Sequence, residues 1–196
     1  MKTFKLLLII STFCSAKMIL AQNKFSNYNS IVFNVKGDLN NDGMPDKVLV
    51  KVDKNDKHLP YLLQVQFQNN DGNYKTVLSS TKAVLPKFTE GGGTSEAILE
   101  KLEIKNGILI FTNQLIRGNF THKFRFQKGN FELIGFQFNN ASAGYIEYVD
   151  YNLSTGDKIV KHIDYETDKI LKQIKTKEKV SPLPKLQDFT PFDFTY

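Results

Sequence analysis

The residues most able to do chemistry lie in one short loop near the N-terminal end of the chain, between Gly37 and Asp46. Oxygen-bearing side chains occupy alternate positions of this loop, and a glycine, Gly43, permits the sharp turn. Positions one, three, five, seven and nine then supply oxygens at the spacing with which a loop wraps Ca²⁺, which takes about six to eight oxygen ligands. We therefore predict a calcium site whose ligands are the side chains of Asp38, Asn40, Asp42 and Asp46 and the main-chain carbonyl of Met44.

Two other interpretations of the loop are open. Asn41-Asp42-Gly43 could be a plain turn between strands, because Asn, Asp and Gly are favoured in turns. A turn alone gives no reason for the other acids, and carboxylates this close repel one another without a cation. An EF-hand would need a helix and a glutamate at position twelve, where Leu49 stands. The β-branched segment Lys47–Val52 predicts that the loop leads into a strand instead.

Residues 37–50 resemble the calcium loop and following strand of FG-GAP repeats, which occur in integrin-like propellers and in many exported bacterial proteins. A propeller needs about four or more blades, and no second copy of the loop is present, so we expect no propeller. More loosely, Ile104–Leu109, Phe124–Gly135 and Tyr151–Lys158 resemble a family of exported bacterial β-rich proteins that carry one such loop. This resemblance implies a fold class and a compartment and supplies no catalytic residue.

The elements that must hold the loop read as antiparallel β-strands. Residues 31–35 form a strand before the loop, so 31–52 should be a hairpin with the ion at its tip. Residues 61–68 alternate apolar and polar side chains with a period of two, which is typical of a sheet with one buried face. Turn signals follow at Asp71-Gly72, Asn106-Gly107 and Gly129-Asn130. We predict a mainly β, single-domain protein of antiparallel strands, as a meander, sandwich or partly open barrel.

The N-terminal residues 1–21 read as a signal peptide. Lys2 and Lys5 precede an apolar run from Leu6 to Ala16, and Ala21 ends a plausible cleavage site before Gln22. The run is shorter than the roughly 20 apolar residues that span a bilayer, so we expect no stable membrane span. Export to the periplasm or the extracellular space follows from this interpretation. The single cysteine, Cys14, would leave with the signal.

The charge of the chain argues against nucleic-acid binding. The formal net charge is +6, and three of the positive charges lie in residues 1–21, which leaves about +3 on residues 22–196. Only Arg117 and Arg125 are available for bidentate phosphate contacts.

Three further segments bear on function. The glycine-rich segment Gly91–Ser95 reads as a mobile loop, and a role in lining a ligand site is the alternative. The phenylalanines between 120 and 138 are expected to fill the core rather than form a binding platform. Residues 181–196, broken by prolines and rich in aromatic rings, should lie extended across the domain, with an exposed partner-binding tail as the alternative.

No recognisable catalytic constellation is present in the sequence. The three histidines, His58, His122 and His162, lie in separate segments without metal-ligand spacing. We therefore expect a non-enzymatic, exported β protein in which calcium is structural and which binds an unknown protein or glycan partner. The alternative is a secreted hydrolase with an unrecognised carboxylate pair, for example Glu132 with Asp150.

Overall fold

A computed structural model describes residues 25–194, and this part of the chain consists of β-strands joined by turns, without a helix. The eleven strands are β1 (Ser30–Gly37), β2 (Asp46–Val52), β3 (Tyr61–Gln68), β4 (Tyr74–Ser80), β5 (Ile98–Lys105), β6 (Ile108–Leu115), β7 (Gly118–Gln127), β8 (Asn130–Ala141), β9 (Tyr145–Asn152), β10 (Asp157–Asp164) and β11 (Ile170–Lys177).

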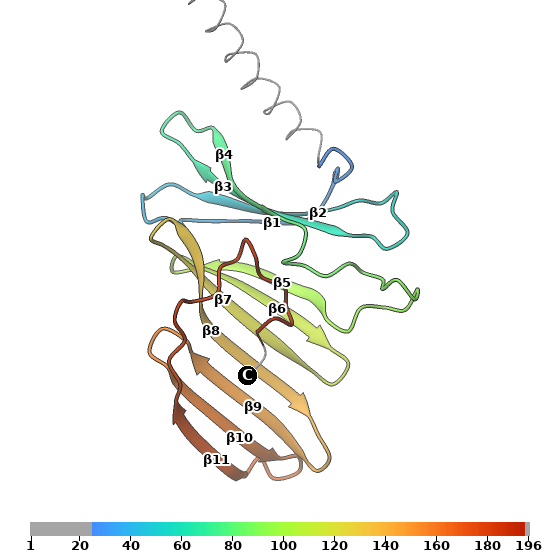
Figure 1. Cartoon of the computed structure of the whole chain (residues 1–196), viewed down its shortest axis with the longest axis vertical. Coiled ribbons are helices and arrows are strands. Elements are labelled where there is room, and N and C mark those ends of the chain that lie inside the picture. Colours follow the sequence, from blue (N-terminus) through green and yellow to red (C-terminus); the bar gives the residue numbers. More distant parts are fainter. Residues whose placement is uncertain (1–24, 195–196) are drawn as a thin grey trace, which may run out of the picture.

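The strands form two antiparallel sheets, and in both sheets each strand pairs with its neighbours in sequence. The smaller sheet has the order β1-β2-β3-β4, and the larger has the order β11-β10-β9-β8-β7-β6-β5. The smaller sheet lies across one end of the larger sheet, while β9, β10 and β11 extend beyond it (Figure 1). The predicted fold class, mainly β with antiparallel strands, is confirmed as two packed meanders without a closed barrel.

The turns follow the glycine and asparagine signals, with one shift. The β5–β6 turn has positive φ at Asn106 (51°) and Gly107 (71°), as a two-residue type I′ turn requires. The β7–β8 turn is built in the same way on Lys128 (51°) and Gly129 (75°). The turn therefore lies one residue earlier than the expected Gly129-Asn130, because Asn130 already belongs to β8.

The core fills the space between the two sheets. From the smaller sheet β2 and β3 contribute aliphatic side chains, and from the larger sheet β6, β7 and β8 contribute mainly phenylalanines. Alternation along β7 points Phe120, His122 and Phe124 inward together. The prediction that the phenylalanines of this region fill the core is confirmed for Phe124, Phe131 and Phe136, which are buried; Phe126 and Phe138 are half-buried and pack against the same core.

The C-terminal segment is part of the larger sheet's packing. Strand β9 pairs with β8 only from Gly135 onward, and residues 184–186 take its place beside the start of β8. There Leu133 N donates to Pro184 O (2.8 Å) and Leu186 N donates to Phe131 O (2.9 Å). Figure 1 shows this segment crossing the face of the larger sheet. Phe189 of this segment is buried, as expected for a docked ring. The segment is not extended throughout, because residues 186–188 and 191–193 form turns.

The signal peptide, its cleavage before Gln22, and Cys14 lie outside the described residues. Within residues 25–194 no helix is long and apolar enough to cross a membrane.

Candidate metal loop and surface hollows

The predicted ligand loop joins β1 to β2, and its conformation is fixed by its own acidic side chains. Asp38 accepts hydrogen bonds from the backbone N–H groups of Asn41 (2.7 Å) and Gly43 (2.9 Å). Asp42 accepts one from Met44 N (2.8 Å). Asn41 and Gly43 have positive φ of 62° and 83°, which curls the backbone around the side chain of Asp38. The backbone of the loop therefore curves around the carboxylates of Asp38 and Asp42.

Asp46 forms the base of the loop and is fully buried. One of its carboxylate oxygens accepts from Leu39 N (2.8 Å), and the other accepts from Gln68 N at the end of β3 (3.1 Å). Burial raises the pKa of Asp46, the two backbone donors lower it, and the charges of Asp42 and Asp38 raise it further.

The ligand atoms that the loop offers are of the chemical type that a hard cation prefers. The loop offers carboxylate, amide and carbonyl oxygens and no nitrogen or sulfur ligand, which is the chemistry that Ca²⁺ prefers. The side-chain amide of Asn40 donates to the Asp42 carboxylate (2.7 Å), so a positive dipole already lies against that acid. Within residues 25–194 no three His, Cys, Asp or Glu side chains converge closely enough to form a metal cluster by themselves. Amide and carbonyl oxygens would have to complete the coordination.

The loop lies where the two sheets meet. Leu39 in the loop is fully buried in the common core. A Cβ atom on Gly37 would come within 2.5 Å of Ile104 Cγ2 in β5, and one on Gly107 would come within 3.3 Å of Asn41 Oδ1. The loop is therefore packed directly on the β5–β6 hairpin of the larger sheet.

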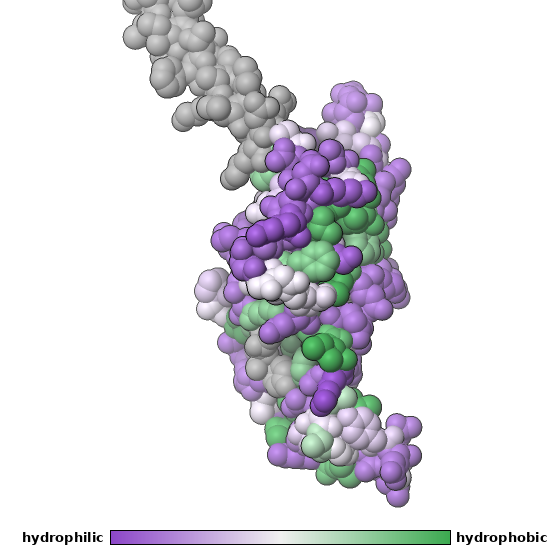
Figure 2. Space-filling model, turned by 90° about the vertical axis from the view of Figure 1, so that its right-hand side faces the viewer, coloured by the Kyte–Doolittle hydropathy of each residue, from purple (hydrophilic) through white to green (hydrophobic). Residues whose placement is uncertain are grey.

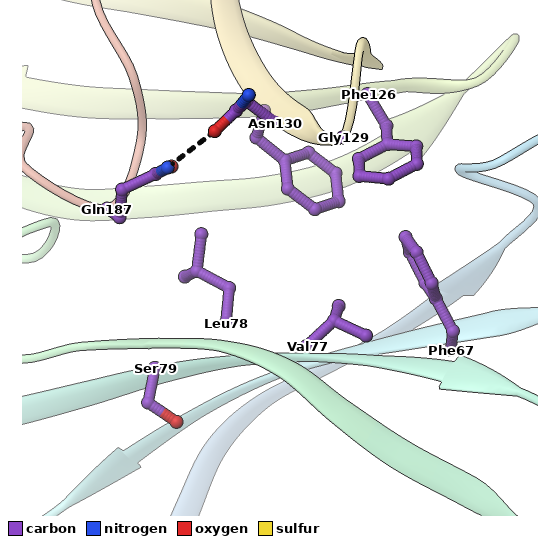
Figure 3. A pocket seen from close by; sticks show the side chains of 9 residues that line it. Phe67, Val77, Leu78, Ser79, Phe126, Gly129, Asn130 and Gln187 are labelled. Carbon is purple, nitrogen blue, oxygen red and sulfur yellow. Dashed lines mark hydrogen bonds between the residues drawn. The ribbon is translucent and has the colours of Figure 1, made fainter.

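One surface hollow opens between the sheets, and we call it the inter-sheet hollow. It measures about 420 Å³ and is lined by Phe67, Val77, Leu78, Ser79, Phe126, Gly129, Asn130, Phe131 and Gln187. Phe67 of the smaller sheet meets Phe126 of the larger sheet edge to face, with 4.9 Å between ring centroids. Figure 3 shows Val77 and Leu78 pointing into the space, and Gln187 bonded to Asn130 at its far end (2.9 Å). No charged side chain lines it among the described residues.

A second hollow lies beside the glycine-rich segment, and we call it the glycine-loop hollow. It measures about 460 Å³ and is lined by Asp56, His58, Pro60, Leu85, Pro86, Phe88, Thr89, Glu90, Ser95, Glu96 and Phe192. A smaller adjoining hollow includes Gly92. Figure 2 faces this side of the molecule, where hydrophobic surface (green) interrupts the hydrophilic surface (purple).

The glycine-rich segment itself has a defined conformation. Phe88 and Thr94 form a β-bridge, Thr89 N donates to Gly93 O (2.8 Å), and Gly92 N donates to Thr89 O (2.9 Å). These bonds close residues 88–94 into a hairpin tip. The sequence contained one signal for this site, the three glycines, but the other lining residues come from segments that only the fold brings together.

The residues considered for catalysis are not brought together. In the register of β8 with β9, Asp150 lies opposite Gln137 rather than near Glu132, and Glu132 bonds to the side chain of Gln127 instead. His58, His122 and His162 lie on the β2–β3 loop, β7 and β10, respectively. His122 is fully buried among phenylalanine rings, which lowers its pKa to about 4.

Comparison of the chain with protein-family models, with curated proteins and with solved structures finds no match in any of the three.

Proposed function

We propose that the chain is an exported calcium-binding β protein in which the ion is structural and the rest of the fold serves as a binding module. The oxygen ligands of the calcium ion would be the side chains of Asp38, Asn40, Asp42 and Asp46 and the carbonyl of Met44. The resemblance of residues 37–50 to an FG-GAP loop and the signal-like residues 1–21 support calcium binding and export, respectively.

The observation that carries the proposal is the setting of Asp46. Its carboxylate is fully buried, two further acids lie near enough to act on its charge, and no lysine or arginine within the described residues forms an ion pair with any of the three. A buried charge is costly unless it is paired or binds a metal. A divalent cation held by the same loop would offset that cost.

The position of the loop supports a structural role for the ion. The loop contacts the β5–β6 hairpin through Gly37 and Asn41, so a cation that fixes the loop also fixes the contact between the two sheets. An ion that binds only the folded state adds RT ln(1 + [Ca²⁺]/Kd), about 1.4 kcal/mol at ten times Kd. Extracellular modules bind calcium with a Kd of about 0.1–1 mM, so the loop would fill after export.

The test is thermal unfolding of residues 22–196 in calcium and in chelator. At about ten times Kd, calcium should raise the Tm by roughly 3–5 °C. Asp42→Ala and the milder Asp42→Asn should both abolish this rise. Glu166→Ala is the matched control, because Glu166 is an exposed acid in the β10–β11 turn of the larger sheet, whereas the ligand loop packs on the β5–β6 hairpin, and this variant should keep the full rise.

An unchanged Tm of the wild-type protein in millimolar calcium and in chelator would contradict the calcium site. Equal rises in Asp42→Asn and in wild type would assign the ion to other residues.

The two hollows support the binding-module part of the proposal. Each is of the size that small ligands or single side chains of a partner fill, a few hundred Å³. The aromatic rings that line them are phenylalanines.

A further inference from the structure

We propose that the glycine-loop hollow binds a small organic cation, a molecule with an apolar body that carries a protonated amine. The proposal concerns a site distinct from the calcium loop and does not depend on the metal.

The hollow has room and an apolar lining for such a body. Its volume of about 460 Å³ falls within the range of small-molecule sites, about 300–1,000 Å³. Its apolar lining consists of Pro60, Leu85 and Pro86 and of the aromatic residues Phe88 and Phe192. Phe192 is 41% exposed although its ring also contacts Phe120, so one edge remains open to a ligand.

Apart from His58, the ionisable side chains that line the hollow are acidic. Asp56, Glu90 and Glu96 line the hollow, and among the described residues that line it there is no lysine or arginine. The protein as a whole carries a net positive charge, so this acidic lining departs from the average surface. All three carboxylates are exposed, so each attracts a cation modestly, and their effects on one ammonium group add.

The aromatic lining also suits an amine. The Lys87 amine lies 5.4 Å from the centroid of the Phe88 ring, within the range of a cation–π contact. A ring of this hollow therefore already faces one ammonium group of the chain. Lys57 belongs to the lining of the adjoining smaller hollow, so both neighbouring lysines lie outside the glycine-loop hollow itself.

His58 holds the acidic side in place. Its backbone N–H donates to Asp56 (2.8 Å), and its ring Nδ1 lies 3.1 Å from the carbonyl oxygen of Thr89, which can only accept a hydrogen bond. The other ring nitrogen faces the Glu90 carboxylate at 3.4 Å. The Glu90 side chain is almost fully exposed, so it is free to turn from the imidazole to an entering amine.

The shape of the hollow is formed before any ligand binds. Phe88 N donates to His58 O (3.1 Å) and Lys87 N donates to Leu59 O (3.3 Å), which ties the glycine hairpin to the β2–β3 loop. Such preorganisation lowers the ordering cost of binding.

The experiment is a titration of the mature protein at pH 7, followed by amide NMR shifts, with three probes of matched shape. Phenethylammonium carries the cation, 2-phenylethanol is the neutral analogue, and phenylacetate is the anion. We expect phenethylammonium to shift resonances of residues 56–60 and 85–96. The alcohol should bind at least about fivefold more weakly, and the anion should cause no shifts. Raising the salt concentration should weaken the binding of phenethylammonium and leave the binding of the alcohol unchanged.

Variants assign the charge effect to named residues. The double variant Glu90→Gln, Glu96→Gln should bind phenethylammonium about fivefold or more weakly than wild type, and its affinity for 2-phenylethanol should be unchanged. Glu100→Gln, an exposed glutamate on β5 outside the hollow, is the matched control and should bind like wild type.

Equal affinity for the amine and the alcohol, or an unaffected double variant, would overturn the proposal. Binding of a lysine-containing peptide in the absence of any phenethylammonium binding would also overturn it, in favour of a basic protein partner. A wild-type calcium response alongside any of these results would leave the metal proposal standing.

Discussion

At His122, a titratable ring lies within the aromatic core of the larger sheet. Its Nε2 is 3.1 Å from the carbonyl oxygen of Phe194, so this nitrogen carries the proton. Nδ1 is buried and has no hydrogen-bond partner within the described residues. The rings of Phe136 and Phe189 contact it at 5.0 and 4.8 Å. This environment tolerates the neutral imidazole and disfavours the charged one.

The first prediction is that His122 makes the protein less stable as the pH falls. Burial lowers its pKa from 6.5 to about 4, so the unfolded chain binds a proton that the folded chain does not. The contribution of neutral His122 to the unfolding free energy is fully present above pH 6.5. It is lost progressively as the pH falls from 6.5 to 4, by about 2 kcal/mol at pH 5. Urea unfolding of wild type and His122→Phe at pH 7.5 and pH 5 measures the effect as a difference between the two proteins. An identical pH dependence in both would show that His122 does not contribute.

The second prediction concerns Gly37, whose missing side chain lets β1 approach β5. A Cβ atom there would lie 2.9 Å from Ile104 Cβ, an atom that cannot rotate away. Gly37→Ala should therefore destabilise the protein by about 1–3 kcal/mol. In the control Gly91→Ala the nearest atom is 3.9 Å away, so its stability should change by less than about 0.5 kcal/mol. Equal unfolding free energies for the two variants would refute the tight contact.

At the scale of elements, the C-terminal segment behaves as a structural strap rather than a free tail. Leu186 and Phe189 are buried, and the Phe189 ring packs against Phe124 at 5.0 Å. Phe192, three residues later, is 41% exposed.

The third prediction follows from this contrast. Phe189→Ala should cost about 3–5 kcal/mol of unfolding free energy because it empties a core position. Phe192→Ala should cost much less, since its ring is half in solvent. Urea denaturation of both variants is the measurement, and a Phe189→Ala variant as stable as Phe192→Ala would mean that the strap contributes little to the core.

The elements themselves could be predicted in large part from the sequence. Alternation along 61–68 marked β3, and Asn106-Gly107 marked the β5–β6 turn, because period-two patterns and type I′ turns are local properties. The β7–β8 turn was placed one residue late because Lys128 adopts a positive φ that its residue type does not announce. The calcium site at residues 38–46 depends on the spacing of oxygen-bearing side chains and stays a prediction.

The packing of one sheet on the other could not be predicted, for a physical reason. Alternation shows which face of a strand is buried but not which element covers it. The contact of Gly37 with Ile104, and the meeting of residues 56–60 with 85–96 and Phe192, depend on pairings between distant segments. The glycine-loop hollow could therefore not be assembled from the sequence.

At the scale of the whole molecule, an exposed edge strand offers unpaired backbone groups to a second copy of the chain. Strand β11 is an edge strand and is exposed along its entire length. Lys172, Lys175 and Lys177 are spread along it. Like charges on an exposed edge disfavour pairing with a second copy of the same edge.

The fourth prediction concerns the N-terminal residues of the chain. If residues 1–21 are a signal peptide, intact-mass measurement of exported protein should find an N-terminus at Gln22 and no cysteine. Retention of Cys14 in the exported material would defeat this assignment.

The strap has a consequence for how the molecule is built. Every strand pairs with a strand next to it in sequence, so each hairpin can form as soon as its two halves are available, and such local contacts favour fast folding. The core position filled by Phe189 and the place beside β8 filled by residues 184–186 are exceptions, because their partners lie some fifty residues or more earlier. A chain emerging in order from its N-terminal end would hold nearly all its hairpins yet leave the aromatic centre open to water until residues 184–189 arrived.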